Sequence, residues 1–385
     1  MINKEIDYVV VGAGLSGSVI ANRLANAGKK VLVLEKRNHI GGNVYDEIDS
    51  TTGVLVQKYG PHIFHTNNED VMKYIKLFSD WEPFVMKCGV DINGVCTPSP
   101  FNFKTVDQFF ELNSELIKSS LKKEYPDSET VTILELLESP NEIIREYAKF
   151  LFDEDYSLYT AKQWGISPDK VDKNVLRRVP VRLDYNEQYF TDKYQVMPKY
   201  GFAKFVSNML NHCNIMVKTG VDALDYLIFD GDYIKVNNGS GCEPLVIWTG
   251  SIDSLFKYDL GVLPYRSLTF KYLKINSEKA QDYPVVAHPR AKGFTRITDY
   301  NNLPPQQCQQ TVIAYEYPVQ YKFGGESDPY YPINNEVNNA LYDKYKNKCK
   351  KYKNLLLLGR LANYKYFNMD EVISEALKLA DSILK

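Results

Sequence analysis

The hydrophobic positions near the start of the chain predict a strand, a helix and a second strand. Tyr8–Val11 is a short apolar run rich in β-branched residues, as expected of a buried strand. Helical spacing of apolar residues follows over Ser18–Asn26, and Gly28 provides a helix stop. Val31–Leu34 is a second buried run. This order predicts the first strand–helix–strand unit of an α/β sheet.

Later apolar runs predict further strands of the same sheet. Ile215–Lys218, Val246–Trp248 and Leu355–Leu358 are short and apolar, and Phe202–Leu210 has helical spacing. A closing helix is predicted after Asn368, with an apolar face formed by Val372, Ile373, Ala376, Leu377, Ala380 and Ile383. Because these segments come from the start, middle and end of the chain, they predict one discontinuous domain.

The intervening residues have two different patterns. From Thr105 to about Trp164 the spacing is helical, and the clearest helix start is Ser139-Pro140-Asn141-Glu142, interpreted as a capping box with proline at the first helical position. Val85–Thr97 alternates around an Asn-Gly pair, which predicts a hairpin. Residues 251–349 are mostly short alternating runs and predict an antiparallel sheet.

Glycines between the first strand and the helix indicate a dinucleotide site. Gly12, Gly14 and Gly17 form G-x-G-x-x-G, and Glu35 ends the second strand. Such glycines let a pyrophosphate approach backbone N–H groups at a helix N-terminus, and the acid suits ribose hydroxyls. The carboxylate would repel a 2′-phosphate, so NADP is disfavoured. A second pair, Gly41-Gly42, is typical of FAD proteins and favours FAD over NAD.

The predicted fold class is therefore α/β, with a discontinuous Rossmann-like FAD-binding domain, an inserted small helical domain and an antiparallel β-sheet domain. The FAD-binding domain is predicted over 1–80, 196–250 and 350–385. The helical domain is predicted over 104–165, and the antiparallel-sheet substrate domain over 81–103, 166–195 and 251–349.

Composition narrows the classes of partner. The chain has 385 residues, 44% hydrophobic and 24% charged, with a net charge of −2, so nothing indicates a nucleic-acid partner. No run approaches the roughly 20 apolar residues of a membrane helix, and no membrane insertion is expected. Six scattered cysteines without C-x-x-C pairing fit a reducing cytoplasm.

Histidines, arginines and tyrosines supply the candidate chemistry. His62 and His65 stand three residues apart beside Gly-Pro, a poor metal pattern, and the simpler interpretation is that they anchor a turn; no metal is expected. Arginine forks and tyrosine hydroxyls suit phosphate oxygens, which indicates a second, anionic ligand. Each arginine by itself is better explained by a surface ion pair than by a bound phosphate.

Several motifs, taken in order, resemble the nucleotide-sugar mutase family of bacterial UDP-galactopyranose mutases over nearly the full length. They are VGAGLSG, EKRNHIGGN, YGPHIFHTNN, YTAKQWG, RRVPVR followed by YF, YEYP, YYPI and GRLANYKYFNMDEVI. The resemblance implies an isomerase that interconverts pyranose and furanose rings of a nucleotide sugar, with N5 of reduced FAD as the nucleophile at the anomeric carbon and no net redox change. It also implies a cytoplasmic homodimer that supplies a furanose for a surface polysaccharide.

The resemblance also implies roles for individual residues. The implied catalytic residues are Arg178 and Arg296, which clamp the diphosphate, and His62, which lies against the isoalloxazine. The other implied substrate residues are Tyr159 (stacked on the base), Thr160, Trp164, Tyr189, Tyr317 and Tyr366. The implied FAD contacts are Gly12, Gly14, Leu15, Ser16, Gly17, Glu35, Lys36, Gly42, Asn43, His62, Ile63, Val217, Thr249, Gly250, Gly359, Arg360 and Met369. Residues 166–182, which carry Arg178, are expected to form a mobile loop.

Departures from the family pattern leave the substrate open. KGFTRITDYNN (292–302) has Phe294 where the family usually has tyrosine, and Asp299-Tyr300 where it has Glu-His. The segment before YTAKQWG reads DEDYSL (153–158). UDP-galactose is the favoured sugar, and UDP-N-acetylgalactosamine, UDP-arabinose and dTDP-fucose remain alternatives. An oxidoreductase of the amine-oxidase type and a non-catalytic dinucleotide-binding module are the competing function classes.

Overall fold

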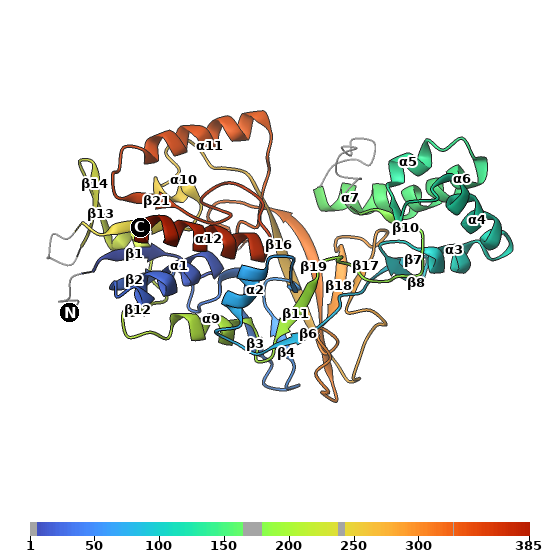
Figure 1. Cartoon of the computed structure of the whole chain (residues 1–385), viewed down its shortest axis with the longest axis horizontal. Helices are drawn as coiled ribbons and strands as arrows, with labels where there is room; N and C mark the ends of the chain where they lie inside the picture. Colours follow the sequence, from blue (N-terminus) through green and yellow to red (C-terminus); the bar gives the residue numbers. More distant parts are fainter. Residues whose placement is uncertain (1–5, 165–178, 238–242, 326) are drawn as a thin grey trace.

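The computed structural model describes residues 6–164, 179–237, 243–325 and 327–385. Segments from both ends of the chain lie together on one side, long strands occupy the middle, and helices of the insertion lie on the other side (Figure 1). No helix in these ranges is both long and apolar enough to cross a bilayer.

A five-stranded parallel sheet is built from distant segments. Its order is β12 (Ile215–Lys218), β2 (Val31–Leu34), β1 (Tyr8–Val11), β15 (Leu245–Trp248) and β21 (Leu355–Leu357). Each strand lies within one residue of its predicted bounds. The prediction that the start, middle and end of the chain share one sheet is confirmed.

Two hydrophobic cores cover the two faces of this sheet. On β1, Val10 packs in the first core, while Val9 and Val11 pack in the second, as strand alternation requires. The helices of the first core are α1 (Leu15–Asn26), α2 (Glu69–Ile75), α9 (Phe202–Leu210) and α12 (Met369–Leu384). The second core contains residues of α10 (Ile252–Leu255), α11 (Glu336–Cys349) and the hairpin β13 (Leu227–Asp230)–β14 (Tyr233–Val236).

Two helices differ from the sequence prediction. Helix α1 begins at Leu15, three residues earlier than predicted, because the glycine turn leads directly into it. Helix α11 lies where alternating strands were predicted. Its Asn335 cap accepts from the Asn338 N–H, and within the helix Tyr345 and Cys349 are the buried residues. With so few fully buried positions among lysines and asparagines, α11 has little helical periodicity to detect.

The second sheet has seven strands. Their order is β20 (Tyr331–Pro332), β16 (Tyr265–Ile275), β19 (Thr311–Gln320), β18 (Arg296–Asp299), β17 (Val285–Ala287), β7 (Cys88–Ile92) and β8 (Val95–Ser99). All neighbours are antiparallel except β7 and β17, which are parallel. The predicted hairpin is confirmed, since Asn93 and Gly94 have φ of 55° and 85° between β7 and β8.

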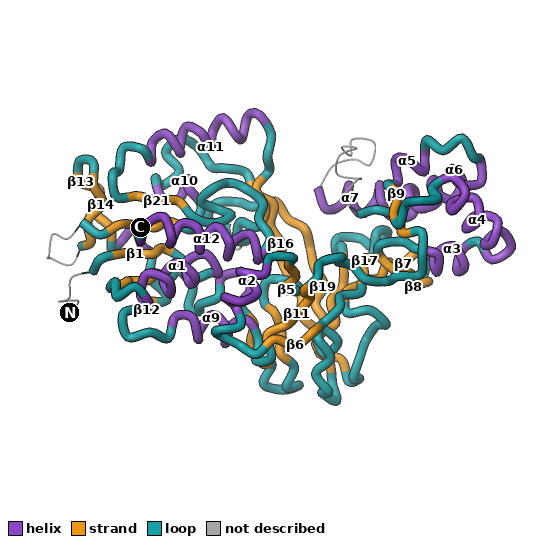
Figure 2. The backbone as a smooth tube through the Cα atoms, viewed as in Figure 1, coloured by secondary structure: helices purple, strands orange, loops and turns teal. Residues whose placement is uncertain are grey.

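Smaller sheets connect these parts. The strands β5 (Phe64–Thr66), β11 (Tyr194–Pro198) and β6 (Trp81–Pro83) form an antiparallel sheet in that order. β3 (Asp46–Ile48) and β4 (Leu55–Gln57) form a hairpin. Long strands β16 and β19 run through the middle of the molecule, between the helices of the first sheet and the insertion (Figure 2).

The insertion is mainly helical, as predicted. It contains α3 (Phe103–Phe109), α4 (Ser114–Glu124), α5 (Ile133–Leu137), α6 (Glu142–Leu151), a π-helical turn η3 (Phe152–Tyr156) and α7 (Ser157–Trp164). The insertion also holds a two-residue strand that the pattern did not indicate, β9 (Thr130–Val131), paired with β10 (Val181–Arg182).

The predicted start of α6 was wrong in detail. The N-cap is Asn141, whose side chain accepts from the Ile143 N–H, so Pro140 precedes the helix and is not its first residue. Ser139 instead accepts from the Asn141 N–H. A third core joins this helix to the second sheet through Ile144 and Val90.

Candidate active site

A cavity of about 1050 Å³ opens at the carboxyl ends of the parallel strands β1, β2 and β15. This edge is where open α/β sheets bind their ligands. One part of its wall carries the glycine turn, Glu35 and Thr249, and another carries His62, Arg296 and Tyr331. The cavity therefore joins the predicted dinucleotide site to residues of the second sheet.

The glycine turn is closely packed. Gly12 has a φ of +103°, and a Cβ on Gly17 would lie 1.9 Å from the Gly12 carbonyl oxygen. A Cβ on Gly42 would lie 3.0 Å from the Gly14 Cα, and the Gly41 N–H donates to the Ala13 carbonyl at 2.8 Å. The second glycine pair thus packs directly on the first loop, leaving backbone exposed to the cavity as a pyrophosphate requires.

Glu35 is held in place at the end of β2. Its two carboxylate oxygens accept from the Ala13 N–H at 2.7 Å and the Arg37 N–H at 2.8 Å, and the residue is 7% exposed. The carboxylate also lines the cavity, where its remaining lone pairs suit ribose hydroxyls. These residues fit an adenine dinucleotide.

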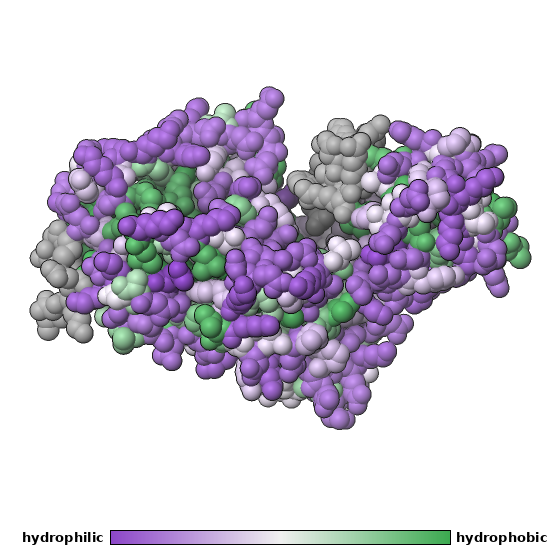
Figure 3. All heavy atoms as spheres, viewed as in Figure 1, coloured by the Kyte–Doolittle hydropathy of each residue, from purple (hydrophilic) through white to green (hydrophobic). Residues whose placement is uncertain are grey.

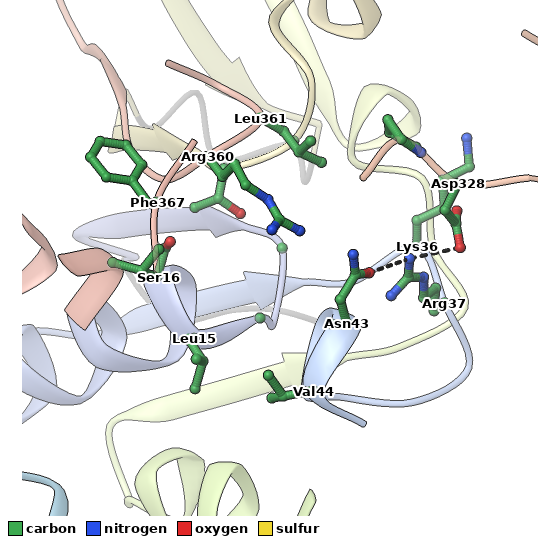
Figure 4. A pocket seen from close by; sticks show the side chains of 18 of the residues that line it. Leu15, Ser16, Lys36, Arg37, Asn43, Val44, Asp328, Arg360, Leu361 and Phe367 are labelled. Carbon is green, nitrogen blue, oxygen red and sulfur yellow. Dashed lines mark hydrogen bonds and ion pairs between the residues drawn. The ribbon is translucent and has the colours of Figure 1, made fainter. Parts of the chain in front are cut away.

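Arg37 and Arg360 lie on either side of this part of the cavity (Figure 4). Arg37 donates to Asn43 at 2.9 Å and pairs with Asp328 at 2.7 Å, which ties the segment after the second glycine pair to the one before β20. Arg360 extends toward the turn between β1 and α1 (Figure 4). Its guanidinium carbon lies 5.3 Å from the centre of the Tyr331 ring.

His62 is neutral at pH 7. Burial, together with the positive charges of Arg360 and Arg296, lowers the pKa of its imidazole to about 4. Nδ1 lies 2.8 Å from the Gly60 carbonyl, which can only accept, so Nδ1 carries the proton and Nε2 is an acceptor. His65 instead contacts Asp192 at 2.8 Å. The two histidines thus have separate partners, and His62 both anchors the turn and lines the cavity.

Arg296 stands at the junction of two cavities. A second cavity of about 180 Å³ adjoins the first, and Ile63, Tyr189, Phe190 and Arg296 line both. The Arg296 Nε and Nη2 donate to one oxygen of Glu316, at 2.8 and 2.7 Å. Since the Glu316 side chain is only 3% exposed, this pair fixes the guanidinium on the shared wall.

The second cavity lies between the insertion and the second sheet. Asp155, Tyr156, Tyr159 and Thr160 come from η3 and α7, and Cys88, Val285 and Ala287 come from β7 and β17. Burial raises the pKa of Tyr159, so its hydroxyl stays protonated. In the space-filling view the molecule is hollowed between its two lobes (Figure 3).

Lys162 joins α7 to the segment that precedes Arg296. Its ammonium donates to the carbonyls of His288, Ala291 and Phe294, at 2.7, 2.7 and 3.0 Å. Burial lowers its pKa, but three carbonyl acceptors satisfy the charged form. The wall formed by α7 is thereby held against the loop that leads into β18.

Most of the predicted site residues meet at these cavities. The predicted residues that line the first cavity are Gly12, Gly14, Leu15, Ser16, Glu35, Lys36, Gly42, Asn43, His62, Ile63, Tyr189, Thr249, Gly250, Arg296, Arg360, Tyr366 and Met369. Tyr159 and Thr160 line the second. Arg178 lies outside the described residues, as do most of the predicted loop 166–182 and the side chain of Trp164.

Four predicted contact residues line neither cavity. Gly17 packs against Gly12, Gly359 packs against Ser16, and Val217 lies on β12 at the edge of the parallel sheet. Tyr317 follows Glu316 on β19, so alternation turns it to the opposite face, where it lies near Phe294. Gly17 and Gly359 are thus packing residues of the site.

Sequence reasoning missed several residues of the cavity walls. Tyr331 lines the first cavity, stacked on Tyr366 with ring centres 5.9 Å apart. The motif YYPI contained it, but only the strand register shows which tyrosine faces the cavity. Asp155 and Phe190 were also missed, and so was Glu316, the partner of Arg296.

Comparison with known proteins identifies the family. A family model described as UDP-galactopyranose mutase matches residues 155–366, more than half of the chain. A UDP-galactopyranose mutase of Mycoplasma genitalium is 37% identical over 99% of this chain and 95% of its own. The chain belongs to the UDP-galactopyranose mutase family. A model of an NAD(P)-binding Rossmann-like domain also matches residues 10–78.

Other similarities agree with this family assignment. A dTDP-fucopyranose mutase of Escherichia coli is 31% identical over 98% of each chain. A crystal structure of reduced UDP-galactopyranose mutase superposes with a TM-score of 0.67 at 17% identity, covering 100% of this chain and 94% of the other, which shows a shared fold. The family confirms the predictions of an isomerase, of the α/β fold and of FAD as the cofactor. It excludes the two competing hypotheses, an amine-oxidase-type oxidoreductase and a non-catalytic dinucleotide-binding module.

Proposed function

We propose that this member of the UDP-galactopyranose mutase family converts UDP-galactopyranose to UDP-galactofuranose. The 37% identity with the mutase of Mycoplasma genitalium supports this substrate. The observation that carries the proposal is Arg296, a partly buried guanidinium that Glu316 orients on the wall between the FAD cavity and a smaller, adjoining cavity. Bound reduced FAD supplies a nucleophilic N5 at the anomeric carbon.

The position of the substrate is inferred from the side chains around Arg296. Arg296, with Tyr189, Tyr331 and Tyr366 nearby on the first cavity wall, holds the diphosphate by charge and phenolic donors. As the bond between the anomeric carbon and the diphosphate breaks, Arg296 stabilises the growing charge. Arg178 is proposed for the same task from its motif.

The sugar and the base then point in opposite directions. The sugar extends toward His62, whose neutral Nε2 accepts a hydrogen bond without adding charge beside the flavin. The base extends into the second cavity, where Tyr159 provides a ring for stacking.

A second candidate is the same isomerisation of dTDP-fucopyranose. The dTDP-fucopyranose mutase with 31% identity over the full length favours it. Phe294 and Tyr300, where this chain departs from the usual family pattern, lie just before and just after β18, the strand that carries Arg296. UDP-N-acetylgalactosamine and UDP-arabinose fit the same chemistry.

The test uses purified holoenzyme reduced with dithionite. UDP-galactose, dTDP-fucose, UDP-N-acetylgalactosamine and UDP-arabinose are supplied separately, and furanose products are separated by chromatography. We expect UDP-galactofuranose from the reduced enzyme and none from the oxidised enzyme. Turnover of only dTDP-fucose would select the second candidate, and stoichiometric sugar oxidation with peroxide release would refute both.

Two further proposals concern the protein as a whole. We propose a homodimer: Leu112, in the short turn η2 (Glu111–Asn113), and Leu116, in α4, are 99% and 56% exposed, and hydrophobic side chains are visible at the outer end of the insertion (Figure 3). Light scattering of the holoenzyme, with Leu112→Glu as the variant, tests it. We also propose a cytoplasmic location, which the free thiols of the five described cysteines support and cell fractionation tests.

A further inference from the structure

Asp155 occupies an unusual position beside the second cavity. It lies in η3, a π-helical turn between α6 and α7, and π turns commonly redirect side chains at functional sites. Together with Tyr156, Tyr159 and Thr160 it forms the insertion's side of that cavity. Its negative charge is close enough to Tyr159 and Tyr189 to raise the pKa of both phenols.

The Asp155 carboxyl has no hydrogen bond or ion pair with any described residue. Burial alone raises its pKa to about 7, so a large fraction is protonated at neutral pH. Asp155 is partly buried on the wall of the second cavity, and a carboxyl in this position loses part of its hydration without gaining a protein partner. A ligand that supplies the missing hydrogen bonds offsets this cost.

The neighbouring acid, Glu154, has the protein partners that Asp155 lacks. Glu154, in the same turn, pairs with Arg290 through two contacts of 2.8 Å and accepts from Asn93 at 3.3 Å. These partners lower its pKa, and Glu154 is absent from the cavity wall. The turn therefore directs one acid to a structural pair and the other to the cavity.

The part of the ligand that reaches Asp155 follows from the proposed function, on which this inference rests. With the diphosphate at Arg296 and the sugar in the FAD cavity, the nucleoside enters the second cavity. Its size, about 180 Å³, and the ring of Tyr159 suit a single-ring base. Asp155 then faces the edge of that base.

We propose that Asp155 recognises the imide edge of a pyrimidine base. One carboxyl oxygen accepts from the base N3–H, and the protonated oxygen donates to an adjacent base carbonyl. Uracil and thymine present the same N3–H flanked by carbonyls, so Asp155 selects this class of base and does not separate UDP-sugars from dTDP-sugars. Discrimination between those substrates must come from other contacts, to C5 of the base, to the pentose or to the hexose.

The experiment measures binding of UDP, dTDP and N3-methyl-UDP to oxidised holoenzyme by calorimetry. Wild-type protein is expected to bind N3-methyl-UDP at least about tenfold more weakly than UDP, because the methyl group removes the donated N–H. Asp155→Asn, whose amide offers the same acceptor and donor, should keep this discrimination. Asp155→Leu should weaken UDP binding by about tenfold or more and bind both ligands equally.

Glu154→Gln is the matched control and should retain the wild-type ratio of the two affinities. Equal affinity of wild-type protein for UDP and N3-methyl-UDP overturns the inference, and so does an undiminished ratio in a folded, FAD-loaded Asp155→Leu variant. Should the leucine variant fail to fold, equal affinity of the wild-type protein for the two ligands still overturns the inference. Failure of the proposed function has a different signature, because UDP itself would then not bind and no furanose would form.

Discussion

At the residue scale, the pair formed by Glu316 and Arg296 holds together the centre of the site. The guanidinium lies on the wall of both cavities, while Glu316 is almost fully buried beneath it. The carboxylate keeps the arginine charged and oriented before substrate arrives, which avoids reorganisation during bond cleavage.

Replacing Glu316 with alanine should therefore disable the arginine. We expect kcat/KM to fall about a hundredfold and UDP affinity to fall with it, while FAD content stays at the wild-type level. Steady-state assays of furanose formation and calorimetry with UDP check this. Glu187→Gln, which alters an acid paired with Lys87 and Lys104 outside both cavities, should leave these constants unchanged. Wild-type turnover in Glu316→Ala would remove the assigned role of the pair.

His62 gives the apoprotein a specific pH dependence. Its folded-state pKa of about 4 lies below the unfolded value of 6.5, so between these values the unfolded chain binds more protons. Stability is therefore lost as the pH falls from 6.5 toward 4, by as much as about 3 kcal/mol. His62→Gln removes this contribution.

Urea unfolding of apoprotein at pH 7 and pH 4.5 measures the effect. The wild-type protein should lose about 2–3 kcal/mol more than His62→Gln on acidification, because every other titrating group is common to both. Asp46 and Asp155, whose pKa values are raised to about 6 and about 7, have the opposite slope and cancel in this comparison. An equal loss in both proteins would show that the imidazole is not buried in its neutral form.

At the element scale, two glycines of the same motif meet different requirements: Gly17 allows helix α1 to pack, and Gly14 allows the cofactor to approach. A Cβ on Gly17 would clash with the Gly12 carbonyl, which α1 must approach to pack on β1. Gly14 has a φ of −77°, and a Cβ there would meet only the Gly42 Cα at 3.8 Å. Gly17 is thus needed for folding, whereas Gly14 is needed where the cofactor approaches.

Alanine at each position should reveal this difference. Gly17→Ala should destabilise the apoprotein by about 2–4 kcal/mol and reduce FAD content, since overpacking shifts α1. Gly14→Ala should unfold like wild type without FAD, yet bind FAD at least about tenfold more weakly, because its methyl group faces the pyrophosphate. Thermal unfolding of apoproteins and FAD titration separate the two effects. Matching behaviour of the two variants would contradict the distinction.

The strands of the parallel sheet could be predicted from sequence because each is a short, fully apolar run between turn signals. The glycine motif and Glu35 were predictable for a similar reason, since their geometry is set within about 30 residues. Helix α11 could not be predicted, because few of its residues are fully buried and its remaining positions are polar. The sequence also could not show which tyrosine lines the cavity, because this depends on the sheet face to which the side chains of Tyr317 and Tyr331 point.

At the scale of the whole molecule, different hydrophobic cores support different parts of the site. The first core includes Leu15, Val44 and Ile63, which also line the FAD cavity. The third core joins the insertion to β7 and has no residue on the FAD cavity wall. It does contribute Val90 and Tyr156 to the second cavity. Stability of the insertion should thus influence nucleotide binding more than FAD binding.

Two alanine substitutions of fully buried residues test this division. Ile144 in the third core and Leu24 in the first are both 0% exposed, so each truncation should cost about 2–5 kcal/mol. Ile144→Ala should weaken UDP binding and speed amide hydrogen exchange in residues 103–164, with FAD affinity unchanged. Leu24→Ala should weaken FAD binding, because α1 carries the glycine turn at its N-terminus. If Ile144→Ala lowered FAD affinity as much as Leu24→Ala, the cores would behave as one cooperative unit, and the insertion could not adjust the nucleotide site independently of the cofactor.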